Sequence, residues 1–70
     1  MQENMMNEIE IEDQNRELAE HCRQWRDAAQ LPASRAAQVL GVPTRTYEGI
    51  EQGRGFRYPK MLMLAIQAFK

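Results

Sequence analysis

Apolar side chains in the first third of the chain recur at intervals of three and four residues, the spacing that puts them on one stripe of an α-helix. The stripe consists of Leu18, Cys22, Trp25 and Ala29. Asp13 is a suitable N-cap for this helix, because its carboxylate can accept a free backbone N–H. Pro32 disfavours helical geometry at the residue before it, so we expect the helix to end near Gln30.

Glycine and proline divide the rest of the chain into three shorter helices. Their expected ranges are 33–40, about 43–52 and 59–69. Gly41 suits the left-handed conformation that ends many helices, and Pro43 and Pro59 fit the first turns of the helices that they open. Two glycines bracket Arg54 in a turn between the third and fourth helices.

The first twelve residues follow a different pattern. Ile9 and Ile11 alternate with glutamates, so a frayed arm, a helical turn and a strand all fit them. We interpret residues 1–12 as an acidic, flexible N-terminal arm and residues 13–70 as the folded domain. Because no other segment alternates over a useful length, the expected fold class is all-α, with four helices.

Length and composition indicate one small domain. The chain has 70 residues, of which 43% are hydrophobic and 27% charged, as in an ordinary globular protein. Cys22 is the single cysteine, and no cluster of His and Cys offers a metal site. There is neither a signal-peptide pattern nor a run of about 18 apolar residues. We therefore expect a cytoplasmic protein with no metal, no cofactor and no membrane partner.

The net charge of −1 conceals a strong asymmetry. Residues 1–20 hold seven acidic side chains and one arginine, whereas residues 21–70 carry a net charge of +5. The larger, basic part of the chain is therefore compatible with a polyanionic partner, although scattered bases also occur on any solvated surface.

Residues 33–51 have the constraints of a helix-turn-helix. Two short helices that cross steeply need a small residue at their contact, which Ala37 supplies, and a tight turn, which Gly41 permits. The apolar anchors that would hold both helices against one core are Ala36, Leu40, Val42, Tyr47 and Ile50.

This segment resembles the Cro/C1-type (XRE-like) helix-turn-helix family of phage and bacterial transcriptional repressors. The residues that carry the resemblance are Leu31, Ala36-Ala37, Leu40-Gly41-Val42, Thr44 to Glu48 and Ile50-Glu51-Gln52-Gly53. The resemblance covers about residues 18–69 and implies a compact, lambda repressor-like domain. Pro32 and Pro43 stand where the family often has capping hydroxyls, and the usual fifth helix is missing.

The resemblance also implies which residues read DNA bases. The reading positions fall on Thr44, Arg45 and Gly49, at the start and in the middle of the third helix. Arg45 could bond guanine O6 and N7 together, and Thr44 could contact a base or a thymine methyl group. Gly49 either permits a close approach of the backbone or leaves a gap. Glu48 could accept a hydrogen bond from cytosine N4, or simply face solvent.

Two further sets of residues have expected roles around the third helix. Candidate phosphate contacts are Ser34, Arg35, Thr46, Gln52, Arg54 and Arg57. The resemblance pairs Arg26 with Glu51 across the fold, where the pair would fix the orientation of the helices. Arg26 is a further candidate for a phosphate contact.

The last helix suggests a dimer. Its apolar residues cover an arc of about 200°, roughly twice what one small core requires. The candidates for a twofold interface are Met63, Leu64, Ile66 and Phe69. The alternative is that this arc closes over the first helix of the same chain.

These observations predict a sequence-specific repressor that binds double-stranded DNA through the major groove. It would be a homodimer on a short inverted repeat, with negative autoregulation as the natural circuit, and would need no small-molecule ligand. We expect no enzymatic activity, because the sequence lacks a nucleophile–base pair, paired carboxylates and a glycine-rich phosphate loop. The rival hypothesis is an antitoxin or adaptor, a protein-interaction module in which the acidic arm binds a basic partner.

Overall fold

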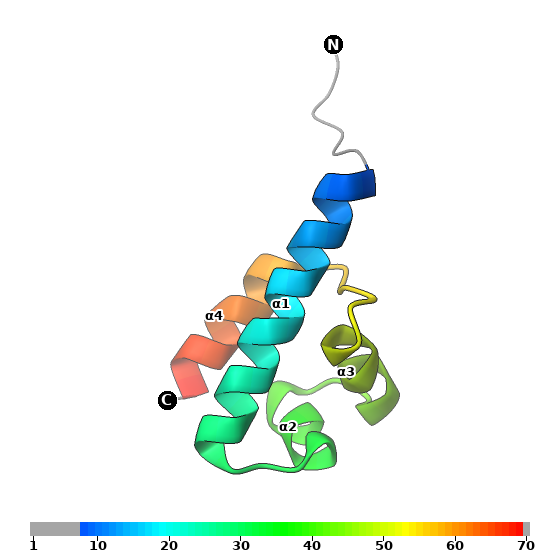
Figure 1. Cartoon of the computed structure of the whole chain (residues 1–70). Coiled ribbons are helices and arrows are strands. Elements are labelled where there is room, and N and C mark those ends of the chain that lie inside the picture. Colours follow the sequence, from blue (N-terminus) through cyan, green and yellow to red (C-terminus); the bar gives the residue numbers. More distant parts are fainter. Residues whose placement is uncertain (1–7, 70) are drawn as a thin grey trace.

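A computed structural model describes residues 8–69, with side chains from residue 10 onward. These residues form a compact all-α domain of four helices without strands (Figure 1). The helices are α1 (Glu8–Ala29), α2 (Ala33–Leu40), α3 (Thr44–Glu51) and α4 (Pro59–Phe69). The predicted fold class is therefore confirmed at the level of helix number and helix order. None of these helices combines the length and the apolar character that crossing a membrane would require.

The first helix starts earlier than the sequence pattern predicts. Residues 8–12, assigned above to the arm, belong to α1, and residues 1–7 lie outside the described part of the chain. Asp13 is therefore an interior residue of the helix and not its N-cap, and its carboxylate pairs with Arg16 at 2.8 Å. Glutamate has a good helix propensity, and negative charge is favourable near a helix N-terminus. These two effects outweigh the strand-like alternation of the isoleucines.

The turn between α2 and α3 has the geometry that the sequence predicts. Gly41 adopts φ +77°, in the left-handed region, and its N–H bonds the carbonyl of Gln38 at 3.2 Å. The N–H of Val42 then bonds the carbonyl of Ala37 at 3.0 Å, which completes the cap at the end of α2. Pro43 is extended, so it precedes α3 as the N-cap residue and does not lie in its first turn.

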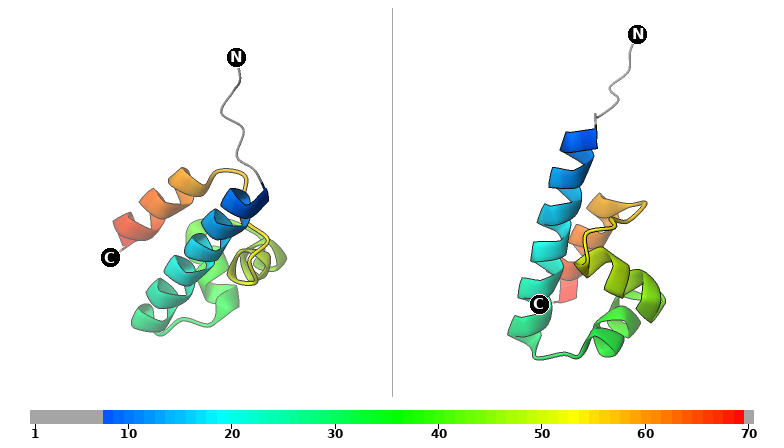
Figure 2. Two further views of the ribbon diagram at one scale, coloured as in Figure 1. Left: turned by 45° about the horizontal axis from the view of Figure 1, so that its top comes forward. Right: turned by 45° about the vertical axis from the view of Figure 1, so that its right-hand side comes forward.

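All four helices contribute to one core. The buried hydrophobic residues are Leu18, Ala19, Cys22, Trp25, Ala36, Ala37, Tyr47, Ile50, Leu62 and Ile66. In Figure 1 and in both views of Figure 2, α4 runs alongside α1, while α2 and α3 form a second pair that packs on them. Tyr47 and Ile50 are completely inaccessible to solvent, which fixes the face that α3 turns inward.

The apolar arc of α4 is divided between the core and the surface. Ile66 is only 5% exposed and packs against the rest of the core, so the prediction that it lies in a dimer interface is wrong for this conformation. Met63 is half-buried against the same core. Phe69 is 42% exposed, but its ring packs edge to face on that of Trp25, with 5.3 Å between the ring centroids. Part of the arc thus closes over α1, as the alternative interpretation stated. Leu64 remains 64% exposed.

Candidate nucleic-acid interface

The outward face of α3 is polar and open to solvent. Thr44, Arg45 and Glu48 are exposed, on the side of the helix away from Tyr47 and Ile50. Three of the four residues predicted to read bases thus share one accessible surface, which we call the α3 face. Arg45, which could form the forked contact to guanine, has no intramolecular hydrogen bond or ion pair within the described chain.

Gly49, the fourth predicted base-reading residue, is buried, although the helical periodicity places it on the α3 face. The side chain of Arg54 covers it. A Cβ atom built on Gly49 would lie 3.0 Å from Nε and 3.3 Å from Nη2 of Arg54. The sequence left open whether Gly49 permits a close approach or leaves a gap. Within the isolated chain it makes room for the Arg54 guanidinium.

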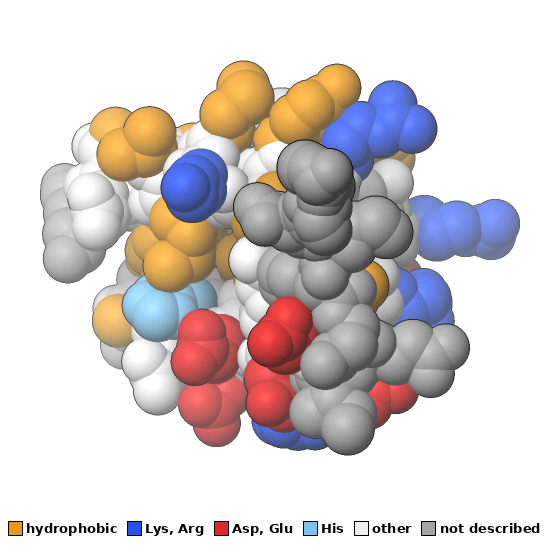
Figure 3. Space-filling view, turned by 90° about the horizontal axis from the view of Figure 1, so that it is seen from above, with side chains coloured by type: hydrophobic (Ala, Val, Ile, Leu, Met, Phe, Trp, Pro, Cys, Tyr) orange, Lys and Arg blue, Asp and Glu red, His pale blue; other side chains and the backbone are white. Residues whose placement is uncertain are grey.

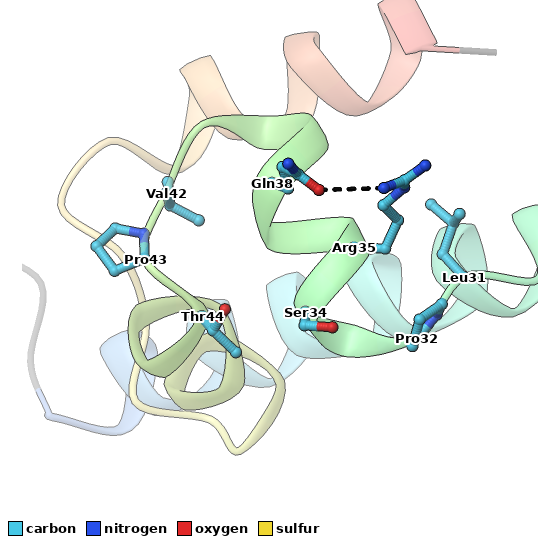
Figure 4. Close-up of a pocket in the computed structure, with 8 residues that line it drawn as sticks. All are labelled: Leu31, Pro32, Ser34, Arg35, Gln38, Val42, Pro43 and Thr44. Carbon is cyan, nitrogen blue, oxygen red and sulfur yellow. Dashed lines mark hydrogen bonds between the residues drawn. The ribbon is translucent and has the colours of Figure 1, made fainter.

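A hollow of about 730 Å³ opens between the N-terminal ends of α2 and α3 (Figure 4). It is lined by Leu31, Pro32, Ser34, Arg35, Gln38, Val42, Pro43 and Thr44. The structure therefore brings two of the predicted phosphate contacts, Ser34 and Arg35, to the same hollow as Thr44, the first residue predicted to read a base. The Arg35 guanidinium donates a hydrogen bond to Oε1 of Gln38 at 3.3 Å.

The two helix N-termini at this hollow have no side-chain cap. Pro32 and Pro43 are the N-cap residues, and neither can accept a backbone N–H through its side chain. The first N–H groups of α2 and α3 are therefore left without a side-chain acceptor, at the positive ends of the two helix dipoles. An anionic oxygen would satisfy them.

The remaining predicted phosphate contacts have different surroundings. Gln52, Arg54 and Arg57 are exposed, whereas Thr46 is half-buried. Figure 3 shows acidic side chains gathered near the start of α1, while Lys and Arg side chains lie on several sides of the same view, one of them directly beside the acidic group. The charge asymmetry of the sequence therefore corresponds only in part to a separation in space.

Arg26 and Glu51 form the pair that the resemblance implies. Nε of Arg26 lies 2.6 Å from Oε2 of Glu51 and Nη2 lies 3.0 Å from Oε1, with side-chain exposures of 23% and 12%. Arg26 also donates to the carbonyl of Leu31 at 3.2 Å, just before α2. Each of its guanidinium nitrogens thus makes a hydrogen bond within the chain, and the phosphate contact also considered for Arg26 stays a prediction.

Tyr47 and Arg23 reinforce this pair, a role that the sequence pattern indicated for neither of them. The Tyr47 hydroxyl donates to the carbonyl of Cys22 at 3.3 Å, and Arg23 donates to the backbone carbonyl of Glu51. Burial alone would raise the pKa of Glu51, but the hydrogen bonds from Arg26, the nearby Tyr47 hydroxyl and the arginine charges together lower the pKa below its usual value. The carboxylate is therefore ionised at neutral pH.

Two other side chains of the first helix have potential for chemistry, Cys22 and His21. Cys22 is fully buried, and burial together with the charge of Glu51 raises its pKa to about 11, so its thiol is protonated at neutral pH. His21 lies on the exposed side of α1, with Nδ1 3.3 Å from the carbonyl of Glu17. Within residues 10–69, no three His, Cys, Asp or Glu side chains are grouped so that they could hold a metal ion.

Comparison with known proteins gives no further assignment, because no family model matches the chain and neither the curated proteins nor the solved structures include a significant match.

Proposed function

We propose that this protein is a sequence-specific double-stranded DNA-binding repressor built on a Cro/C1-type helix-turn-helix. One observation carries the proposal: α3 buries Tyr47 and Ile50 completely while Thr44, Arg45 and Glu48 stand exposed on its other side. A helix held in this way can enter a major groove about 12 Å wide with its polar side toward the base edges. Arg45 is the principal base-reading residue, and Thr44 and Glu48 contribute at neighbouring positions.

The surroundings of α3 support binding to the DNA backbone. The uncapped N-termini of α2 and α3 and the hydroxyls of Ser34 and Thr44 meet at one hollow, where they could receive phosphate oxygens. Arg35 and Arg57 add positive charge from the surface of the same molecule. Contacts of this kind would position the protein on the duplex and make its binding salt-dependent.

A homodimer is part of the proposal, with a revised interface. Met61 and Leu64 are 66% and 64% exposed, and Ala65 and Ala68 are exposed as well. These four residues are spaced i, i+3, i+4 and i+7, so they form one stripe, which we call the α4 stripe. Figure 3 shows hydrophobic side chains gathered along the edge that α4 forms. The two alanines would let the backbone of a twofold-related α4 approach closely.

Such a dimer would account for recognition by so small a domain. Two α3 faces about 34 Å apart would read half-sites in successive major grooves, so the operator would be a short inverted repeat. Bound at a promoter, the dimer would repress by steric exclusion, and its occupancy would follow its own concentration. Negative autoregulation suits this behaviour.

The test is a comparison of the wild-type protein with Arg45→Ala and Arg16→Ala. The operator is first selected from a random duplex pool, and affinity is then measured for that duplex and for a scrambled one. We expect Arg45→Ala to lose about 10- to 100-fold in discrimination between the duplexes. Arg16 is exposed on the acidic part of α1, so its replacement should leave discrimination unchanged. Normal operator binding by Arg45→Ala would refute the proposed reading face.

The second candidate, an antitoxin or adaptor that binds another protein, is favoured by one specific observation. The first turns of α1 extend beyond the other helices in Figure 1, and the exposed side chains there include Glu12 and Asp13, with Glu17 following where α1 meets the start of α4. Such a surface would suit a basic partner protein. Glu12→Lys with Glu17→Lys separates the two functions: loss of a co-purifying protein supports an adaptor, whereas unchanged or tighter DNA binding supports the repressor.

A further inference from the structure

Arg54 is held against the one position of the α3 face that lacks a side chain. Its backbone N–H donates to the carbonyl of Gly49 at 2.9 Å, just beyond the end of α3. Gly53 and Gly55 adopt φ values of +92° and +83°, so the chain turns sharply on both sides of Arg54. The guanidinium consequently folds back onto the helix, and the position that a Cβ of residue 49 would occupy lies 3.0–3.5 Å from Nε, Nη2 and Cζ.

This placement brings a second guanidinium to the α3 face. Gly49 is one helical turn beyond Arg45, and residues four apart lie on the same side of a helix. Arg54 remains exposed, and within residues 10–69 no carboxylate or carbonyl accepts a hydrogen bond from its side chain. Its planar set of N–H donors is therefore free, next to the residue that is expected to read guanine.

We propose that Arg54 is a specificity-determining residue that reads a base in the major groove, in place of the side chain that Gly49 lacks. This inference rests on the proposed DNA-binding function and changes the assignment of Arg54 from a phosphate contact to a base contact. The forked guanidinium would bond O6 and N7 of a guanine beside the base pair read by Arg45. Gly49 is required because a methyl group there would occupy the space of the Arg54 side chain.

The experiment compares the operator motifs that different variants select from one random duplex pool. Wild type, Arg54→Ala, Arg54→Lys and Arg57→Ala each undergo selection, and circular dichroism confirms that each variant is folded. We expect Arg54→Ala to lose a preference of about 10- to 100-fold at one base pair while the rest of the motif is retained. Arg54→Lys keeps the charge but not the fork, so it should lose the same preference and keep its affinity for a scrambled duplex.

Arg57→Ala is the matched control for a contact to phosphate. It should weaken binding to all duplexes alike and reduce the salt dependence by about one counterion, without a change of motif. If Arg54→Ala behaves in the same way, Arg54 contacts phosphate and the inference is wrong. If the wild type selects no motif at all, both the inference and the proposed function fail. Failure of the inference alone is therefore distinguishable from failure of the proposed function.

Gly49→Ala tests the geometry on the protein side. Alanine favours a helix more than glycine does, and the atoms it would meet are the far end of a flexible side chain, so the variant should fold. We expect it to displace the Arg54 guanidinium and to lose the same base preference as Arg54→Ala. When Gly49→Ala is combined with Arg54→Ala, the motif should be the same as that of Arg54→Ala alone. A Gly49→Ala motif identical to that of the wild type would overturn the inference.

Discussion

The guanidinium of Arg26 donates two hydrogen bonds to the carboxylate of Glu51, one to each oxygen, at 2.6 and 3.0 Å. They connect the last turn of α1 to the last residue of α3. The same arginine holds the chain before α2 through the carbonyl of Leu31. The Arg26 side chain thus connects α1 to α3 and to the segment before α2, and the orientation of the α3 face depends on these contacts. The pair is mostly shielded from solvent, so its loss would leave a poorly solvated charge.

The first prediction concerns the stability that this pair provides. Glu51→Ala should lower the free energy of unfolding by about 3 kcal/mol, because the Arg26 charge would stay partly buried without its partner. Asp13→Ala, which removes the carboxylate of the exposed pair with Arg16, should cost less than about 1 kcal/mol and serves as the control. Urea denaturation measures both values. If both variants lowered the free energy of unfolding by the same amount, the Arg26–Glu51 pair would stabilise the fold no more than an exposed ion pair does.

The second prediction concerns the stability of the folded protein at low pH. Because the folded state lowers the pKa of Glu51, the folded state binds this proton less readily than the unfolded chain, where the pKa is near 4.5. The contribution of Glu51 to stability is therefore complete above about pH 4.5 and is lost as the pH falls through the lower pKa of the folded protein. Glu51→Gln cannot titrate, so the stability difference between wild type and Glu51→Gln should shrink below pH 4.5. A constant difference between pH 7 and pH 3 would contradict this assignment.

Features governed by local rules could be predicted from the sequence. The bounds of α2, the left-handed turn at Gly41 and the inward face of α3 follow from apolar spacing and from the conformational freedom of glycine. The Arg26–Glu51 pair is separated by 25 residues, so periodicity could not reveal it, and it came from the family resemblance.

Features that depend on tertiary contact could not be predicted. Helical periodicity places Gly49 on an open face, but the turn after α3 brings Arg54 over it, and no local pattern encodes this return. Similarly, the apolar arc of α4 did not reveal that Ile66 would join the core while Met61 stayed exposed. The signal available for Gly49 was the presence of a second arginine in a glycine-bracketed turn only five residues away.

The third prediction concerns self-association through the α4 stripe. Leu64→Glu introduces a charge at a residue that is 64% exposed, so the monomer should stay folded while the dimer dissociation constant rises by about 10- to 100-fold. Gln67→Glu adds the same charge to an exposed position of α4 outside the stripe and should leave the dimer unchanged. Sedimentation analysis over a range of concentrations makes the comparison. A wild-type protein that is monomeric throughout would refute the dimer.

The fourth prediction uses the buried thiol as a reporter of opening. Cys22 is inaccessible in the folded state and its pKa is raised to about 11, so an aromatic disulfide reagent at pH 8 should label it only when the core opens. When closing is faster than labelling, the rate follows the free energy of opening. Glu51→Ala should then be labelled about 100-fold faster than the wild type, since about 3 kcal/mol corresponds to two powers of ten. Asp13→Ala should be labelled nearly as slowly as the wild type. If the wild-type thiol reacts as fast in buffer as it does in urea, α1 does not cover Cys22 as tightly as its burial indicates.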